Sequence, residues 1–238
     1  MLLRAAAAAL ALVAPAAVAA NPGGAAVDPT GRHSSSLGRS ADGRPIMAIE
    51  TGDLDASRRM LVVGCIHGNE PAGIAIAERL AHDPPPRELD LWIIPILNPD
   101  GVVANVRGNA NGVDLNRNFP FRWRPLTGIY DSGPYPLSEP ESRIAQRLIT
   151  ELKPQLSVWF HQHLDVVDQS GGNPAIEKRF ATLVGLPLVQ LPREPGSVVG
   201  WENHRLPGTT AFVVELPAGS PSTAAIHRYA HAVLAIDR

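Results

Sequence analysis

The stretch that decides the fold is MLVVGCIHGNE at residues 60–70, in which an apolar run leads directly into a polar turn. The run at 60–66 has the length and branching of a strand buried on both faces, and residues 91–97 repeat that form. Between them, residues 71–81 carry aliphatic side chains at helical spacing, and Pro71 fits the first helical position. The segment predicts two interior strands joined by a crossover helix, with Asn98-Pro99-Asp100-Gly101 as a turn after the second strand.

The second half of the chain continues this alternation. Ser138-Glu139-Pro140-Glu141 has the pattern of a capping box, in which two side chains bond each other's backbone donors. The further predicted elements are strands at 156–160 and 210–214, and helices that end before Pro154, run from Pro174 to Gly185 behind an Asn173 cap, and cover 220–236. Strands alternating with helices predict an α/β fold: a three-layer α/β/α arrangement around a mixed, largely parallel central sheet.

Composition narrows the class of protein. The 238 residues include 21 Lys and Arg against 23 Asp and Glu, a net charge of −2, which argues against a nucleic-acid partner because such proteins need a strong positive field. With 45% hydrophobic and 18% charged residues the chain can bury a core. Cys65 is the single cysteine, so no internal disulfide can form.

The N-terminal segment differs from the rest. Residues 1–20 have a basic start, an alanine-rich apolar run and a small-residue cleavage site near Ala19, in the order of a secretory signal peptide. An uncleaved anchor is the alternative, although Pro15 interrupts the run. Residues 21–40 predict a flexible lead-in, and 41–238 a single domain. We therefore expect a secreted or extracytoplasmic protein with no stable membrane span after cleavage; the oligomeric state stays open.

The polar residues that follow the strands suggest a metal site. His67 and Glu70 lie three residues apart across a glycine turn and can converge on one cation. A catalytic zinc ion needs a third protein ligand, and His161 follows the predicted strand at 156–160 directly. His163 shares the same face of an extended segment and remains an alternative third ligand.

A neighbouring pair of polar residues has the donors needed to bind a carboxylate. Asn116 and Arg117 stand together in a Gly- and Asn-rich stretch. Because arginine offers a planar fork to two oxygens and asparagine adds a directional donor, the pair predicts binding of a substrate with a free carboxyl end.

Several motifs, in this order along the chain, together resemble the zinc carboxypeptidase family. They are His67-x-x-Glu70, Asn98-Pro99-Asp100-Gly101, Asp114-Leu115-Asn116-Arg117-Asn118-Phe119, the segment Ser138 to Glu141, His161 after a strand, and Glu215 in Phe212-Val213-Val214-Glu215-Leu216. The resemblance runs from about residue 38 to the last helix. Within the family, residues 107–120 are most similar to bacterial murein peptide amidases, which cut the γ-D-glutamyl to diaminopimelate bond of cell-wall peptides.

The resemblance implies an activity and a role for each site residue. The chain would be a secreted zinc-dependent metallopeptidase with one zinc ion, hydrolysing an amide bond of a peptide or muropeptide next to a terminal residue that carries a carboxylate. The implied roles are zinc ligation by His67, Glu70 and His161, general base catalysis by Glu215, stabilisation of the oxyanion by Arg107, and binding of the terminal carboxylate by Asn116 and Arg117.

One departure from the family pattern bears on the substrate. Well-studied carboxypeptidases have a mobile tyrosine on the loop ahead of the catalytic glutamate, but residues 188–201 contain none. This disfavours ordinary C-terminal trimming by a general metallocarboxypeptidase. A zinc deacylase of N-acyl amino acids and a catalytically inactive peptide- or wall-binding domain remain as alternatives.

Overall fold

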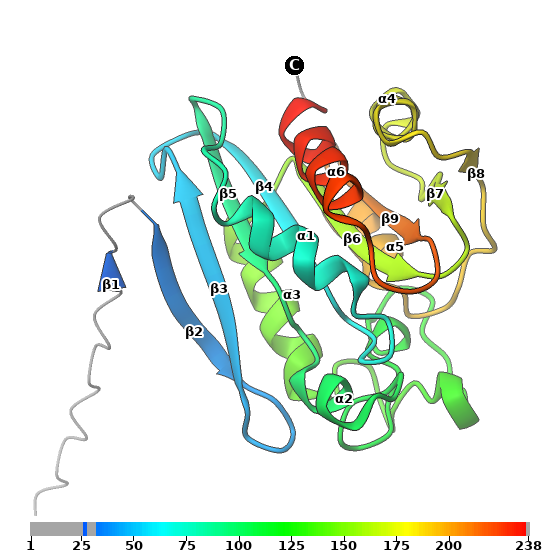
Figure 1. Ribbon diagram of the computed structural model, residues 1–238. Coiled ribbons are helices and arrows are strands. Elements are labelled where there is room, and N and C mark those ends of the chain that lie inside the picture. The colour runs from blue at the N-terminus through cyan, green and yellow to red at the C-terminus, as the bar shows by residue number, and fades with distance from the viewer. Residues whose placement is uncertain (1–25, 28–31, 237–238) are drawn as a thin grey trace, which may run out of the picture.

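The computed structural model describes residues 26–27 and 32–236 (Figure 1). The predicted signal peptide lies outside these residues. The strands are β1 (Ala26–Val27), β2 (His33–Arg39), β3 (Pro45–Gly52), β4 (Arg58–Val63), β5 (Leu89–Ile94), β6 (Leu156–Gln162), β7 (Val166–Asp168), β8 (Leu188–Val189) and β9 (Thr210–Leu216). The helices are α1 (Ala72–Leu80), α2 (Pro99–Ala104), α3 (Pro140–Leu152), α4 (Pro174–Val184), α5 (Val198–Arg205) and α6 (Thr223–Ala235), with short 3₁₀ turns η1 (Leu115–Arg117) and η2 (Gly128–Tyr130).

In the described residues one sheet has the strand order β1-β2-β3-β5-β4-β6-β9-β7-β8. The four central strands, β5-β4-β6-β9, are parallel, whereas β2, β3 and β7 join antiparallel to their neighbours towards the centre. Helices α1, α4 and α6 pack on one face, and α3 and α5 on the other. The predicted α/β fold with a mixed sheet is confirmed, with the parallel part concentrated at its centre.

The alternation of side chains along the central strands separates two cores. In β6, Val158 and Phe160 face α1, α4 and α6, while Trp159 joins the core under α3 and α5. His161 is next on that second face, and it lies opposite Glu215 of β9 in register. Both polar residues therefore come to the carboxyl ends of adjacent parallel strands, on one face of the sheet.

The helix ends confirm one predicted cap and correct another. Asn173 accepts a hydrogen bond from the Ala175 backbone N–H at the start of α4, and Gly185 ends this helix with φ +75°, as expected. The predicted capping box at the start of α3 is wrong. Glu139 is the N-cap and makes no side-chain cap bond, because the Ser138 hydroxyl donates to the Glu139 carboxylate instead.

Two more predictions need correction. Residues 33–39, placed in the flexible lead-in, form β2, because pairing with β3 satisfies the backbone of a serine-rich segment that has no apolar period. The segment that begins at Asn98, expected as a turn, opens helix α2: the Asn98 side chain accepts from the Gly101 backbone N–H, and Pro99 takes the first helical position.

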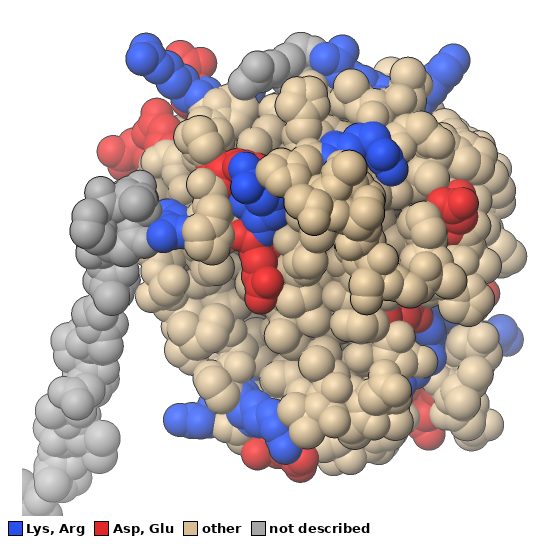
Figure 2. Space-filling model, viewed as in Figure 1, with Lys and Arg blue, Asp and Glu red and all other residues tan. Residues whose placement is uncertain are grey.

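Among the described residues, none of the helices combines the length and the apolar character that crossing a bilayer requires. On the face shown in Figure 2, acidic and basic side chains lie beside one another between neutral residues.

Candidate active site

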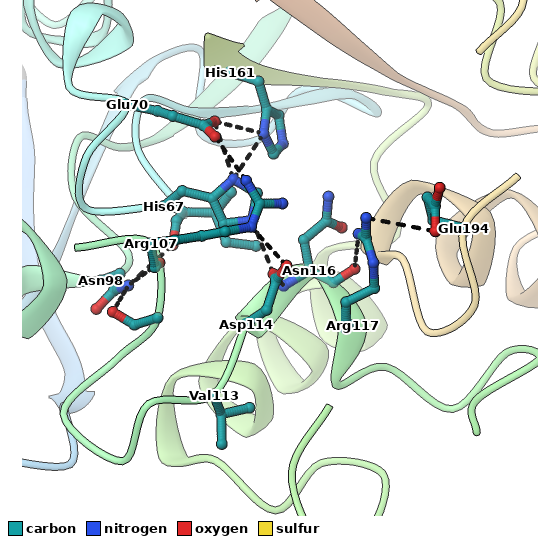
Figure 3. A network of polar contacts seen from close by, with 12 residues as sticks. His67, Glu70, Asn98, Arg107, Val113, Asp114, Asn116, Arg117, His161 and Glu194 are labelled. Atoms are coloured by element: carbon teal, nitrogen blue, oxygen red, sulfur yellow. Dashed lines mark hydrogen bonds and ion pairs between the residues drawn. The ribbon is translucent and has the colours of Figure 1, made fainter. Parts of the chain in front are cut away.

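Three side chains converge at the carboxyl ends of β4 and β6 (Figure 3). The Nδ1 atoms of His67 and His161 lie 3.2 Å apart, and each lies 3.0 Å from Oε2 of Glu70. All three residues are buried. The His163 side chain is exposed and is not part of this group of ligand atoms.

Close contact between two motifs holds the turn that carries His67. A Cβ atom added at Gly68 would lie 1.8 Å from the carbonyl carbon of Gly101, so the loop after β4 rests against the backbone of α2. The Asn98 side chain joins these segments, because its amide donates to the carbonyl oxygens of Ile66 and Arg107. Glycine at position 68 is thus required by the approach of two backbones.

Asp114 orients the first histidine. Its Oδ1 lies 2.9 Å from Nε2 of His67, and its Oδ2 accepts from Nε of Arg107 at 2.8 Å. Burial alone would raise the pKa of Asp114, but His67 and Arg107 lower it below its usual range. An ionised Asp114 accepts the Nε2–H of His67 and leaves the Nδ1 lone pair directed at Glu70 and His161.

The donor set fits a divalent cation of the size of zinc. The Arg107 guanidinium donates to the other oxygen of Glu70, Oε1, at 2.9 Å, and this positive neighbour favours the ionised carboxylate. Two nitrogen lone pairs and a carboxylate oxygen facing one another repel unless a positive charge lies between them. Ligand atoms about 2.0–2.1 Å from a tetrahedral zinc ion would lie about 3.3–3.4 Å apart, slightly more than the observed 3.0–3.2 Å.

Glu215 lies beside this cluster. It is the register partner of His161 in β6 and lines the same cleft, and its buried Oε2 has no hydrogen-bond partner. A carboxylate with one unengaged oxygen next to a metal site can accept a proton from water.

Arg107 lines the same cleft and contacts the cluster through Glu70. Its Nη1 donates to Oε1 of Glu70 at 2.9 Å, while its Nε bonds to Asp114. These two carboxylates fix the guanidinium over the cleft, where it can stabilise negative charge on a reacting oxygen.

The structure brings Asn116 and Arg117 to the same cleft on η1. Oδ1 of Asn116 accepts from the Val198 backbone N–H, so its amide NH₂ is the donor left for a ligand. The Arg117 guanidinium donates to the Asn116 carbonyl and lies 3.6 Å from Glu194, but its buried Nε has no partner. The Asn116 amide and the Arg117 guanidinium, which both line the cleft, can therefore donate to a carboxylate there.

All seven predicted site residues line one cleft of about 840 Å³. The lining also includes Tyr130 of η2, whose ring lies 5.3 Å from the guanidinium carbon of Arg107 and 5.4 Å from that of Arg117. An aromatic ring thus reaches both arginines from a segment other than the tyrosine-free loop at 188–201.

Sequence reasoning missed the roles of Asp114, Tyr130 and Glu194. Asp114 lies in the motif with Asn116 and Arg117, and an acidic residue directly before a 3₁₀ turn was the available signal. Tyr130 and Glu194 lie in irregular segments where no spacing marks them.

Comparisons with known proteins show which family the chain resembles. A model of the zinc carboxypeptidase family (peptidase M14) matches residues 25–172. Murein peptide amidase A of Vibrio campbellii is 32% identical over 200 residues, which cover 77% of this chain and 79% of that protein. Carboxypeptidase SOL1 of Arabidopsis thaliana is 32% identical over 142 residues, covering 53% of this chain but 28% of that longer protein.

A solved structure has a similar fold. The crystal structure of murein-tripeptide amidase from Escherichia coli O157 superposes with a TM-score of 0.72 and 27% identity, covering 84% of this chain and 90% of the other. The chain therefore belongs to the zinc carboxypeptidase family, a family of zinc-dependent hydrolases, and is similar within it to the murein peptide amidases.

Proposed function

We propose that this protein is a secreted zinc hydrolase that cuts the amide bond before a terminal residue bearing a free carboxylate, with the γ-D-glutamyl to diaminopimelate bond of cell-wall peptides as substrate. The observation that carries the proposal is the convergence of three ligand atoms, 3.0–3.2 Å apart, beside the unpartnered carboxylate oxygen of Glu215. The similarity to two murein peptide amidases supports the substrate.

The proposed metal ligands are His67, Glu70 and His161, for one zinc ion per chain. Zinc bound to these side chains would supply a Lewis acid, which lowers the pKa of water and polarises the scissile carbonyl. Asp114 bonds Nε2 of His67 and so keeps the ring turned with Nδ1 towards the site, as carboxylates commonly do for zinc-binding histidines.

Three residues then carry the chemistry and the binding. Glu215 takes a proton from the attacking water and passes it to the leaving amine as the amide C–N bond breaks. Arg107, already fixed by two carboxylates, stabilises the developing oxyanion. Arg117 and Asn116 line the cleft and hold the carboxylate of the leaving residue with the guanidinium and the side-chain amide as donors.

The location outside the membrane is supported by residues 1–20, whose order of basic, apolar and small residues is that of a signal peptide. Cell-wall peptides are available there. N-terminal sequencing of the protein recovered from the extracytoplasmic fraction is expected to begin near residue 20 or 21; a chain that stays in the cytoplasm with Met1 intact would contradict secretion.

The substrate is tested by mass spectrometry of products. The purified zinc-loaded protein is incubated in parallel with L-Ala-γ-D-Glu-diaminopimelate and with an ordinary L-peptide that ends in phenylalanine. Release of free diaminopimelate supports the proposal. Rapid trimming of the ordinary peptide without cleavage of the cell-wall peptide would instead identify a general carboxypeptidase.

A further inference from the structure

The cleft continues past Glu215 into a recess along β7 and β9. Val166 pairs with Glu215, and Val167 with Val214, which sets Asp168 beside Val213. Because Val167 and Val214 belong to the core under α4 and α6, Asp168 faces the opposite way, into the cleft that it lines. Asp168 thus lies deeper than Glu215 on the same face of the sheet.

Asp168 is a buried acid, 6% exposed, with an arginine beside it. Its Oδ1 accepts from the Leu191 backbone N–H at 2.9 Å, and its Oδ2 accepts from the Ser170 hydroxyl at 2.6 Å. The Nη1 atom of Arg193 lies 3.5 Å from the same Oδ2. The carboxylate is therefore firmly held, whereas its contact with the guanidinium is long.

Arg193 belongs to the loop that also reaches the carboxylate-binding side of the cleft. Its guanidinium donates to the Gln169 carbonyl, and its side chain is 36% exposed. The next residue, Glu194, pairs with Arg117, and Gly196 packs against the Arg117 backbone. One short segment connects the recess with the site proposed for the terminal carboxylate.

The charges in the recess select a particular side chain. A buried aspartate alone would favour a simple ammonium group, as in lysine. The aspartate with an adjacent arginine forms a neutral pair, and its best partner carries both charges, with an ammonium for Asp168 and a carboxylate for the Arg193 fork. An apolar side chain would leave both charged groups without new partners.

The recess is long enough for such a side chain. Two residues along a strand, from Glu215 to Val213, span about 6.8 Å. In diaminopimelate, four C–C bonds separate the two α-carbons, and they span about 5 Å when extended. Val199 and Val213 line the cleft beside these charged groups, and methylene groups pack well on such surfaces.

We propose that Asp168 and Arg193 form a specificity subsite that binds the distal ammonium and carboxylate of the released residue, and so selects a diamino dicarboxylic acid. This inference rests on the proposed hydrolase function, because it assigns the side-chain end of the same leaving residue. It adds two residues that decide selectivity and take no part in the bond cleavage.

Kinetics with three matched substrates test the subsite. The peptides L-Ala-γ-D-Glu-X carry meso-diaminopimelate, L-lysine or L-norleucine as X, so only the distal charges differ. The wild-type enzyme is expected to favour diaminopimelate by at least about 10²-fold in kcat/KM over both others. Equal rates for the three peptides would overturn the inference.

Variants separate the two charges. Arg193→Gln is expected to lower kcat/KM for the diaminopimelate peptide by at least about 30-fold, to raise it for the lysine peptide, and to leave the norleucine peptide within about threefold. Asp168→Asn is expected to lower kcat/KM for both the diaminopimelate peptide and the lysine peptide. Arg39→Gln, at an exposed arginine of β2, is the matched control. If Arg193→Gln leaves unchanged the ratio of kcat/KM for the diaminopimelate peptide to kcat/KM for the norleucine peptide, the subsite is contradicted. Because Arg193 is more exposed than Asp168, this variant still tests the subsite if Asp168→Asn fails to fold.

Calorimetry distinguishes failure of the subsite from failure of the proposed function. If the wild-type enzyme cuts none of the three peptides, the hydrolase assignment fails. Titration of the zinc-loaded protein with free meso-diaminopimelate still tests the subsite: binding that weakens at least about tenfold in Arg193→Gln, but not in Arg39→Gln, supports it. Binding that is absent in the wild-type protein, or identical in the variant, overturns it.

Discussion

The two walls of the cleft are built differently. The wall with His67 and His161 follows central parallel strands, and these rings are 1% and 3% exposed. The wall with Arg117 comes from 3₁₀ turns and the loop before α5, where Tyr130 is 47% exposed and Glu194 forms a long ion pair. The difference teaches that His161 and Glu215, proposed to act at the reacting bond, lie on central strands, while Asn116 and Arg117, proposed to hold the terminal carboxylate, lie on a short 3₁₀ turn.

The largest effect is expected on the strand-borne wall. Glu215→Gln should lower kcat by about 10²- to 10⁴-fold with little change in bound zinc, because Glu215 is proposed as the base and not as a metal ligand. Steady-state kinetics and metal analysis of the same sample check this. Near-normal turnover would place the base elsewhere and remove the chemical distinction between the walls.

Burial of an acid beneath the central strands also predicts a dependence of stability on pH. Glu202 of α5 is fully buried under β6, where Ser157 donates to it, and burial raises its pKa from 4.5 to about 7. Between these values the folded chain keeps a proton that the unfolded chain has lost. The contribution is therefore fully present below pH 4.5, and the free energy of unfolding falls as pH rises to 7, by on the order of 3 kcal/mol.

Thermal unfolding across this pH range checks the Glu202 prediction. Glu202→Gln should flatten the decline, since the amide has no proton to lose, whereas Glu78→Gln at an exposed position of α1 should keep the wild-type slope. The same slope in Glu202→Gln and wild type would show that another group titrates.

The two arginines sharpen the comparison between chemistry and recognition. Arg107→Ala should lower kcat by about 10²-fold with a smaller change in KM, because Glu70 and Asp114 fix Arg107 beside the candidate metal ligands. Arg117→Ala should mainly raise KM, by about 10- to 10²-fold, for substrates with a free carboxylate. The opposite pattern in kcat and KM would exchange the two roles.

A smaller effect is expected at Glu194. This carboxylate pairs with Arg117 when no substrate is present, and it must be displaced by a substrate carboxylate. Since partly exposed ion pairs contribute at most about 1 kcal/mol, Glu194→Gln should lower KM by up to about fivefold and leave kcat unchanged. A higher KM in this variant would mean that Glu194 assists binding.

The parts of the fold that were predicted have local signals. The strand at 156–160 and the position of His161 followed from one apolar run and its end, because parallel strands bring their carboxyl ends to one edge of the sheet. The cap at Asn173 is equally local. Strand β2 was missed because its serine-rich sequence has no period of its own and pairs with β3.

The candidate site likewise contains residues that the sequence identified and contacts that it did not reveal. His67, Glu70 and His161 were identified by spacing and resemblance, and the structure brings them together. Asp114 touches His67 across 47 residues of sequence, and Asp168 meets Arg193 across 25. Such contacts depend on how β7, η1 and the loop before α5 fold against the sheet, so no pattern within one segment marks them.

Zinc content tests the central assignment most directly. After dialysis against metal-free buffer, the wild-type protein and the His163→Ala variant are expected to retain one zinc ion per chain, because the His163 side chain is exposed outside the ligand group. His161→Ala should lose most of its zinc, since two ligands bind far more weakly than three. Full zinc in His161→Ala, with loss only in His163→Ala, would contradict the account.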